Sequence, residues 1–225
     1  MAPAKNENTF YQSGWFELRS TVRRRCVRCV RSDAVPYRRL PLIVAATEIE
    51  IAHVPRSLPR VITGLGKTAA AVATTVALTR MAAEPGGLEG LVVLNVGTAG
   101  ALRDEIVGLH QPGAVFNHDL NGDAIRALGF DPREELTVEG DDTVLASGDL
   151  FVTDPAVRAR LAERAHLVDM EGYAVALSCD QFGVPLRLVK HVSDNADGTA
   201  HDWPTAVAAS AVVLGQWVEQ HLDEA

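Results

Sequence analysis

Short apolar runs alternate with longer stretches of helical periodicity along the chain from residue 40 onward. The apolar runs predict buried strands at 42–46, 61–63, 91–95, 114–116, 143–146, 166–169 and 186–192. Helical patterns cover 67–83, 124–128, 172–182 and 203–222, and a further helix is expected after Thr153 or Asp154, with Pro155 in its first turn. This alternation predicts an α/β fold of three layers, in which helices flank a mixed, mostly parallel central sheet.

Two glycine-rich stretches follow predicted strands and are expected to form turns. Residues 64–66 (GLG) lead into the first helix; Gly66-Lys67-Thr68 resembles the end of a P-loop, but that motif needs glycine at position 61, where valine stands. Residues 97–100 (GTAG) follow the third strand, and a turn there would bring backbone N–H groups and the Thr98 hydroxyl close to a ligand. The polar, acidic segment 117–142 is predicted to be a long surface excursion.

Charge divides the chain into a short basic part and a long acidic part. Residues 1–40 carry nine Lys and Arg against three Asp and Glu, whereas the rest carries twelve against twenty-six. Residues 1–39 are interpreted as a basic N-terminal extension to one domain at 40–225. A disordered extension or a misassigned start fits this segment best, and a targeting peptide or a functional arm are the alternatives. Cys26 and Cys29 lack the second pair of ligands that a tetrahedral zinc site needs.

Composition and net charge narrow the classes of function. Apolar residues make up 47% of the 225 residues and aromatic residues only 5%, which suits helices packed on a valine-rich sheet. A net charge of −8 argues against nucleic acid or an anionic membrane surface as a partner. The three cysteines are too few for a disulfide framework, and no apolar run is long enough to span a membrane. These features predict a cytoplasmic protein, and no set of metal-binding residues emerges.

Three carboxylates stand after predicted strands or at the start of a helix, namely Glu50, Glu171 and Asp194. Ligands of α/β proteins bind at the carboxyl ends of the strands, so these groups are expected to meet at one rim of the sheet. Together they could activate water, protonate a leaving group and hold a diol. Each alone would be better explained as a helix cap or a surface charge. Their number, beside the GTAG stretch and Met170, favours acid–base chemistry.

Five motifs occur in a characteristic order along the chain. They are TGLGKTAAA at 63–71, LNVGTAG at 94–100, SGDLFV at 147–152, VDME at 168–171 and VSD at 192–194. In this order they resemble the motifs of the nucleoside phosphorylase/nucleosidase superfamily, most of all those of 5′-methylthioadenosine/S-adenosylhomocysteine nucleosidases and related bacterial nucleosidases. The resemblance covers about residues 40–222. It implies a phosphorylase/hydrolase-like fold and an enzyme that hydrolyses the N-glycosidic bond of a purine nucleoside, releasing free base and sugar.

The resemblance also implies roles for individual residues. Glu50 matches the acid that activates the attacking water, and Asp194 matches the acid that protonates the departing purine. The implied substrate-binding residues are Thr98 near the water and ribose, Phe151 and Val152 at the base, Met170 and Glu171 at the ribose, and Ser193 beside Asp194. The resemblance implies no metal, no cofactor, a small-molecule nucleoside as substrate, and a homodimer in which residues 117–119 reach toward the partner subunit.

Two features of the sequence favour water over phosphate as the nucleophile. Related phosphorylases have an arginine where this chain has Asn95, and a glycine-rich loop with arginine where this chain has TEIE at 47–50. An acid at that place would repel a phosphate dianion. A phosphate-dependent purine nucleoside phosphorylase and a non-catalytic nucleoside-binding protein are the alternatives. The 5′ group is left open between alkylthio, homocysteinyl and futalosine-type substituents, because Thr47 replaces a methionine that helps to line the 5′ pocket of nucleosidases.

Overall fold

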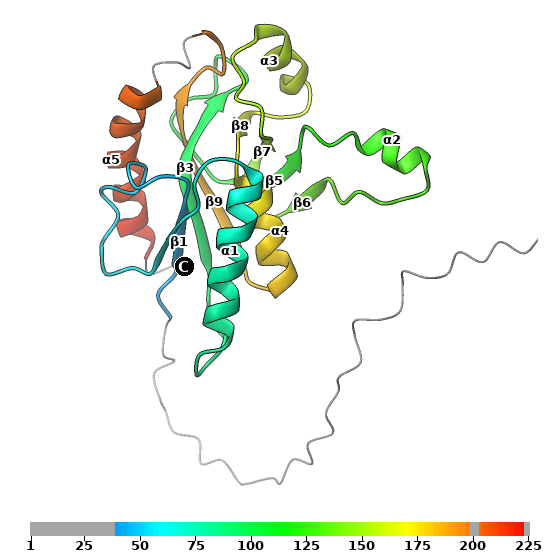
Figure 1. Ribbon diagram of the computed structural model, residues 1–225. Coiled ribbons are helices and arrows are strands. Elements are labelled where there is room, and N and C mark those ends of the chain that lie inside the picture. The colour runs from blue at the N-terminus through cyan, green and yellow to red at the C-terminus, as the bar shows by residue number, and fades with distance from the viewer. Residues whose placement is uncertain (1–38, 199–202, 223–225) are drawn as a thin grey trace, which may run out of the picture. The chain divides into compact units, whose positions relative to one another are not determined.

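The computed structural model describes residues 39–198 and 203–222 of the chain (Figure 1). The predicted N-terminal extension, 1–39, lies outside these residues except for its last one, so its character stays a prediction. The strands are β1 Leu42–Ala45, β2 Arg60–Ile62, β3 Val93–Ala101, β4 Leu109–His110, β5 Pro112–Asn117, β6 Glu135–Thr137, β7 Asp141–Ser147, β8 Leu167–Asp169 and β9 Leu186–Asp194. The helices are α1 Lys67–Ala82, α2 Gly122–Ala127, α3 Pro155–Ala162, α4 Gly172–Phe182 and α5 Trp203–His221.

The strands form one mixed sheet in which most neighbours run parallel. β1 lies between β2 and β3, and β9 pairs along nearly all of β3, each pair being parallel. β7 joins β5 and β8 in parallel in the other half of the sheet. The halves meet where the end of β3 pairs antiparallel with β8, and the short strands β4 and β6 add two further antiparallel pairs. The prediction of a mixed, mostly parallel sheet is confirmed.

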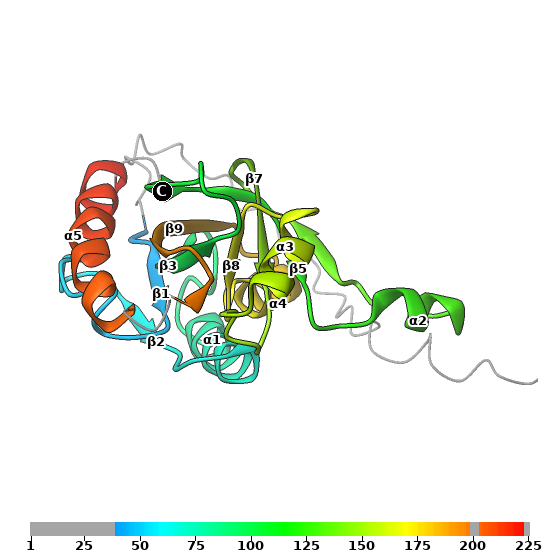
Figure 2. The same cartoon turned by 90° about the horizontal axis from the view of Figure 1, so that it is seen from above.

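Helices cover both faces of the sheet, so the three predicted layers are confirmed. Figure 1 shows α1 and α4 together on one face and α5 across β1 and β3 from them, and Figure 2 shows the same arrangement from above. The core under α1 and α4 contains Leu78, Val175 and the sheet residue Leu188. Leu214 and Val218 of α5 belong to a second core on the opposite face. Burial on both faces explains why β1 and β3 appear as continuous apolar runs.

The structure corrects the prediction that residues 97–100 form a turn. These residues continue β3 and pair with β9, from Gly97 opposite Lys190 to Gly100 opposite Asp194. Gly97 and Gly100 are not among the glycines with positive φ, whereas Gly64 and Gly66 in the turn before α1 have φ of 78° and 92°. The predicted strand-to-helix turn at 64–66 is therefore confirmed, and the glycines at 97 and 100 serve a different purpose, which the pocket explains.

The predicted surface excursion at 117–142 also contains regular structure. Helix α2 lies close to its expected place, but β6 follows it and pairs with β5. β6 has three residues, and only the middle one, Leu136, is buried. A strand this short leaves no recognisable alternation of apolar and polar residues in the sequence. The two residues of β4 leave no recognisable pattern for the same reason. None of the helices in the described part of the chain is long and apolar enough to cross a membrane.

Candidate active site

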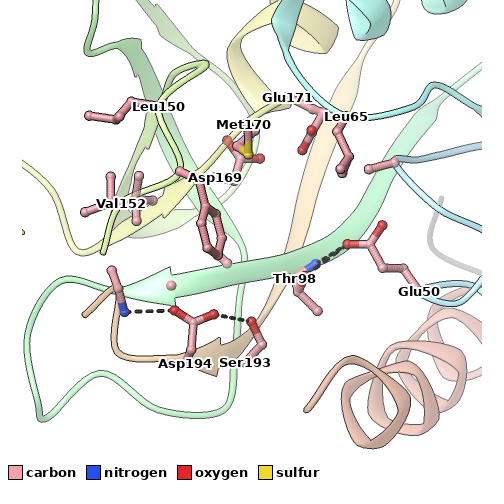
Figure 3. A pocket seen from close by; sticks show the side chains of 16 residues that line it. Glu50, Leu65, Thr98, Leu150, Val152, Asp169, Met170, Glu171, Ser193 and Asp194 are labelled. Carbon is pink, nitrogen blue, oxygen red and sulfur yellow. Dashed lines mark hydrogen bonds between the residues drawn. The ribbon is translucent and has the colours of Figure 1, made fainter. Parts of the chain in front are cut away.

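A pocket of about 330 Å³ opens beside the carboxyl end of β3 and is lined by every residue that the sequence predicted for the site (Figure 3). These residues are Glu50, Thr98, Phe151, Val152, Met170, Glu171, Ser193 and Asp194. The volume falls in the range of small-molecule sites. The predicted convergence of the three carboxylates on one cavity is therefore confirmed, while their chemical roles stay predictions.

Strand direction explains how segments far apart in the sequence reach one cavity. Asp194 ends β9 opposite Gly100 of β3, because these two strands are parallel. β8 is antiparallel to the end of β3, with Val168 opposite Gly100, so the chain after β8 runs back along β3 toward Thr98. Glu171 therefore enters the cavity from the opposite direction to Asp194. The antiparallel junction of the sheet halves is what brings the two acids together.

Glu50 lies in the turn after β1 and is almost fully buried, with 3% of its surface exposed. Its Oε1 accepts hydrogen bonds from the backbone N–H and the hydroxyl of Thr98, at 2.9 and 3.0 Å. Its Oε2 accepts hydrogen bonds from the backbone N–H and the hydroxyl of Thr47, at 3.0 and 3.1 Å. Thr47 is not among the pocket-lining residues. The structure thus gives Thr47 the role of holding Glu50, where the sequence suggested only a lost contact to the 5′ group.

The glycines of the GTAG stretch make room for two carboxylates. A Cβ atom added at Gly97 would lie 3.0 Å from Oε1 of Glu50, and one added at Gly100 would lie 3.0 Å from Oδ1 of Asp194. Contacts this short would force each carboxylate to move. Glycine is therefore needed at 97 because β3 approaches Glu50 closely, and at 100 because β3 approaches both Asp194 and the Cβ atom of Ala196, the latter at 2.9 Å.

Asp194 is partly buried at the end of β9 and is held by its neighbours in sequence. The Ser193 hydroxyl donates a hydrogen bond to Oδ2 at 2.8 Å, and the backbone N–H of Ala196 donates one to Oδ1 at 2.8 Å. Figure 3 shows Thr98 between Asp194 and Glu50, so the two acids border the cavity at separate points. A bound molecule could therefore have one acid near each of two reacting groups.

Glu171 directly precedes α4 and is 7% exposed. Its Oε1 accepts a hydrogen bond from the backbone N–H of Gly66 at 2.7 Å, at the start of α1. Burial raises the pKa of this carboxyl to about 7, and the negative charge of Asp169 adds to the rise, while Lys190 and the Gly66 hydrogen bond oppose it. Glu171 therefore changes between its protonated and ionised forms close to neutral pH.

A buried ion pair, which reasoning from the sequence missed, lies next to these acids. Lys190 Nζ of β9 lies 2.8 Å from Asp169 Oδ2 of β8, and the two side chains are only 2% and 1% exposed. Asp169 also accepts hydrogen bonds from the Ser147 hydroxyl and from the backbone N–H of Gly172, the latter at 2.9 Å. Burial by itself would lower the pKa of Lys190, but the negative charges of Asp169, Glu171 and Glu50 outweigh it and raise the pKa. Lys190 thus supplies a permanent positive charge beside the carboxylates.

The mouth of the pocket is apolar. Leu65, Leu150 and Phe151 line it and are 60%, 49% and 46% exposed. Phe151 and Val152, which the sequence predicted at the base, thus occupy one wall of the cavity, and Val152 is buried. Leu65 and Leu150 are lining residues that the motifs alone did not single out. An apolar rim around acidic groups suits a molecule with a flat, weakly polar part and a polar part.

The charged groups of the lining are acids. Within residues 39–198 and 203–222, the pocket is lined by no lysine or arginine. In the same part of the chain, no group of three or more His, Cys, Asp or Glu side chains is arranged to hold a metal ion. The cavity therefore favours a neutral or cationic species over an anion.

Comparison with known proteins agrees with the motifs. Residues 109–218 match the family model described as Phosphorylase superfamily. The chain is 28% identical over 160 residues to 5′-methylthioadenosine/S-adenosylhomocysteine nucleosidase of Shewanella halifaxensis. The aligned region covers 60% of this chain and 66% of that protein. The chain is 30% identical over 124 residues to aminodeoxyfutalosine nucleosidase of Helicobacter pylori, which covers 54% of this chain and 53% of that protein. The chain thus spans slightly less than two thirds of the length of the Shewanella protein and about half of the length of the Helicobacter protein.

The fold is similar to that of solved structures as well. One of them is an Asp-to-Asn mutant of the Helicobacter pylori nucleosidase with 5′-methylthioadenosine in its active site. It has a TM-score of 0.70 and 23% sequence identity, and the similarity covers 83% of this chain and 99% of that chain. At 23% identity this similarity supports a shared fold and nothing further. The match of residues 109–218 to the phosphorylase superfamily model and the similarity to nucleosidases agree with the resemblance that the five motifs indicate, and the shared fold is consistent with both.

Proposed function

We propose that this protein is a nucleosidase that hydrolyses the N-glycosidic bond of a 5′-modified adenosine, releasing the free base and the sugar. The observation that carries the proposal is the meeting of Glu50, Glu171 and Asp194 in one pocket of a size suited to a nucleoside. The names of the relatives, which are nucleosidases of adenosine derivatives, support the same substrate class.

In the proposed reaction the purine leaves as a neutral base. Asp194 donates a proton to the purine while the bond between the base and C1′ of the sugar breaks. The sugar then resembles an oxocarbenium cation, which the carboxylates of Glu171 and Glu50 stabilise. A water molecule bonds to C1′ through its oxygen, and Glu50 takes the proton that this water loses. Glu171, in its ionised form, accepts hydrogen bonds from the ribose hydroxyls and holds the sugar in place.

Water suits this pocket better than phosphate does. Phosphorolysis requires cationic side chains around a phosphate dianion, and the lining residues of the described chain include none. Lys190 is the cation beside the acids, but it is buried and bound to Asp169 at 2.8 Å. A dianion would lie against Glu50 and Glu171 without compensation. The alternative of a phosphorylase therefore has no support from the site, and retention of all three acids speaks against a non-catalytic binding protein.

The 5′ substituent is proposed within the chemistry of the relatives. Their names give methylthio and homocysteinyl groups in one case and a futalosine-type group in the other. Thr47, the position that suggested an altered 5′ pocket, points instead to Glu50. We therefore include all three substituents as candidates and leave the choice to the assay below.

A homodimer is part of the proposal, together with a cytoplasmic location. The pocket-lining Leu65 and Phe151 are largely exposed, and Val72 and Val76, one helical turn apart on α1, are 61% and 41% exposed. Exposed apolar side chains around a binding site are typical of a surface that a partner covers. Light scattering on the purified protein should give twice the mass of one chain, and a monomer that is fully active would contradict the proposal. The cytoplasmic location rests on the low cysteine content.

The function is tested by following base release in phosphate-free buffer. We expect 5′-methylthioadenosine, S-adenosylhomocysteine or aminodeoxyfutalosine to release adenine without phosphate, and added phosphate to leave the rate unchanged. Phosphate dependence would favour the phosphorylase, since its sugar product carries the phosphate. Absence of base release from every member of the panel would refute the enzyme proposal.

We expect Gly97→Ala to lower kcat about tenfold, because Oε1 of Glu50 must move by a few tenths of an ångström to clear the new Cβ. Base release and thermal unfolding would be measured on the same sample. Gly198→Ala is the matched control, since a Cβ atom there meets nothing within 4 Å. A fully active Gly97→Ala variant would show that the close approach of β3 to Glu50 has no bearing on the reaction.

A further inference from the structure

The start of α1 binds two acids, Glu171 of the pocket lining and Asp149 of the loop that carries Leu150 and Phe151. The backbone N–H of Gly66 donates a hydrogen bond to Glu171 at 2.7 Å. The next backbone N–H, that of Lys67, donates one to Oδ1 of Asp149, also at 2.7 Å. Asp149 belongs to the loop between β7 and α3, so successive amides of one helix start bind a pocket acid and a loop acid. Free N–H groups and the helix dipole favour carboxylates at this place.

The side chain of Lys67 holds the same loop from a second direction. Its Nζ donates a hydrogen bond to Oδ1 of Asn117 at 2.7 Å and forms an ion pair with Asp119. Asp119 accepts a hydrogen bond from the backbone N–H of Asp149 at 2.7 Å through its other oxygen. The Lys67 side chain is 15% exposed, so solvent screens these contacts only in part. Lys67 thus binds Asp149 in two ways. Its backbone N–H binds the Asp149 carboxylate directly, and its side chain binds Asp119, which in turn accepts a hydrogen bond from the Asp149 backbone N–H.

This loop carries part of the apolar wall of the pocket. Leu150 and Phe151 directly follow Asp149, line the cavity, and are about half exposed. The contacts of Asp149 therefore help to fix the position of the backbone that carries these two side chains. Asn117 and Asp119 contact Lys67 of the same chain, and the expectation that residues 117–119 reach toward a partner subunit stays a prediction.

We propose that Lys67 is a positioning residue for the nucleoside. Through Asp119 and Asp149 it holds Leu150 and Phe151 in the pocket wall. Its backbone N–H binds Asp149 of this loop, while the preceding backbone N–H, that of Gly66, binds Glu171. Lys67 does not line the pocket and acts only through these contacts. The effect on a nucleoside rests on the proposed function, whereas the effect on the loop does not, so the two can be tested separately.

Hydrogen exchange tests the effect on the loop without any ligand. We expect Lys67→Met to speed amide exchange in residues 148–152 about tenfold or more, while exchange in β9 stays as in the wild type. Arg126→Met is the matched control, because Arg126 of α2 also binds two acids, Asp123 at 2.8 Å and Glu134 at 2.9 Å, and neither acid belongs to the loop of residues 148–152. Unchanged exchange in residues 148–152 of Lys67→Met would overturn the proposal, whatever the protein's activity.

Kinetics on 5′-methylthioadenosine test the effect on the substrate. We expect Lys67→Met to raise KM about tenfold and to change kcat by less than about threefold, with Lys67→Arg restoring most of the loss. Asp119→Asn should act in the same direction, and the double variant should be no worse than the worse single variant, since both remove one linkage. Faster exchange with an unchanged KM would overturn the positioning role. A wild-type protein that is inactive on the whole panel would refute the proposed function. Hydrogen exchange would then still test whether Lys67 holds residues 148–152 in place.

Discussion

Asp194→Asn is expected to lower kcat for base release by about 10²–10⁴-fold, the range that one general acid contributes. The asparagine amide cannot give up a proton at neutral pH, so the purine would have to leave as an anion. The variant keeps the shape of the side chain, and its oxygen can still accept the hydrogen bond that Ala196 donates at 2.8 Å. The pocket should therefore stay intact, and nucleoside affinity should change by less than about tenfold.

The choice of leaving group makes this test specific for proton donation. A riboside with a nitrophenolate leaving group needs no protonation, so Asp194→Asn should lose much less activity on it than on the purine nucleoside. Single-turnover rates and calorimetric affinities separate chemistry from binding. Asp180→Asn is a suitable control, because Asp180 forms an exposed ion pair with Arg133 at 2.8 Å away from the pocket. Equal losses on both leaving groups would assign Asp194 to binding or structure rather than to acid catalysis.

The acids of the site could be found in the sequence because all three stand after predicted strands or at the start of a helix, close to motifs in a characteristic order. Asp194 ends β9, and Glu50 lies in the turn after β1, where it is 3% exposed. A buried acid at the end of a strand has no use for the stability of the fold unless something binds it. Order along the chain then supplied the roles, because five separate motifs had to agree. The layers and most strands followed from the alternation of apolar runs and helical patterns.

The supporting residues could not be found because their signals are shared with ordinary structure. Lys190 lies next to His191 in β9, and a lysine is far more often exposed to solvent than fully buried, so its position alone gives no sign of a buried ion pair. Only the pairing of β8 and β9 with β3 shows that Lys190 turns inward to Asp169. Glycines 97 and 100 indicated a turn, since close approach of a strand to a carboxylate depends on contacts across the sheet. Contacts between side chains of different strands depend on how the strands pair in the folded sheet, and local sequence patterns do not specify that pairing.

Charge balance connects these supporting residues to the proposed chemistry. Lys190 contacts Asp169 and lies close enough to Glu50 and Glu171 for their charges to raise its pKa. One positive charge cannot neutralise three carboxylates, so the empty pocket holds an excess of negative charge. Burial, and after it the negative charge of Asp169, raises the pKa of Glu171 to about 7. The same excess would stabilise a cationic sugar, so the unfavourable charge of the empty pocket and the proposed catalysis have one origin.

Glu171→Gln is expected to stabilise the fold above neutral pH while it abolishes most activity. The pKa of Glu171 is about 7 in the folded chain, against an ordinary value of 4.5. A raised pKa means that the fold favours the protonated form, so its contribution is fully present below pH 4.5 and is lost as the pH rises through 7. Ionisation of Glu171 therefore costs the folded state roughly 3 kcal/mol at pH 8, from a difference of about 2.5 pKa units at about 1.4 kcal/mol each. Glutamine avoids this cost, and its side-chain oxygen can still accept the hydrogen bond from Gly66.

Denaturant unfolding at two pH values checks the stability part of this prediction. Glu171→Gln should exceed the wild type in unfolding free energy by roughly 3 kcal/mol at pH 8 and by much less at pH 5, since the wild-type carboxyl is largely protonated there. Glu135→Gln, at an exposed acid that lies 3.6 Å from Arg164, should change stability by no more than about 1 kcal/mol at either pH. A loss of stability in Glu171→Gln that is equal at both pH values would contradict the raised pKa.

The activity of the same variant decides whether the destabilising charge serves the reaction. An amide cannot accept both ribose hydroxyls as a carboxylate can, nor stabilise a cationic sugar, so kcat/KM should fall at least about 100-fold. In the wild type, kcat/KM should decline as the pH falls below about 7, because protonation of Glu171 in the free enzyme removes the form that binds the sugar. Glu171→Gln should lack this decline. A variant that is more stable at pH 8 yet fully active would show that the charge of Glu171 has another purpose, because a protein keeps an unfavourable buried charge only where its function requires one.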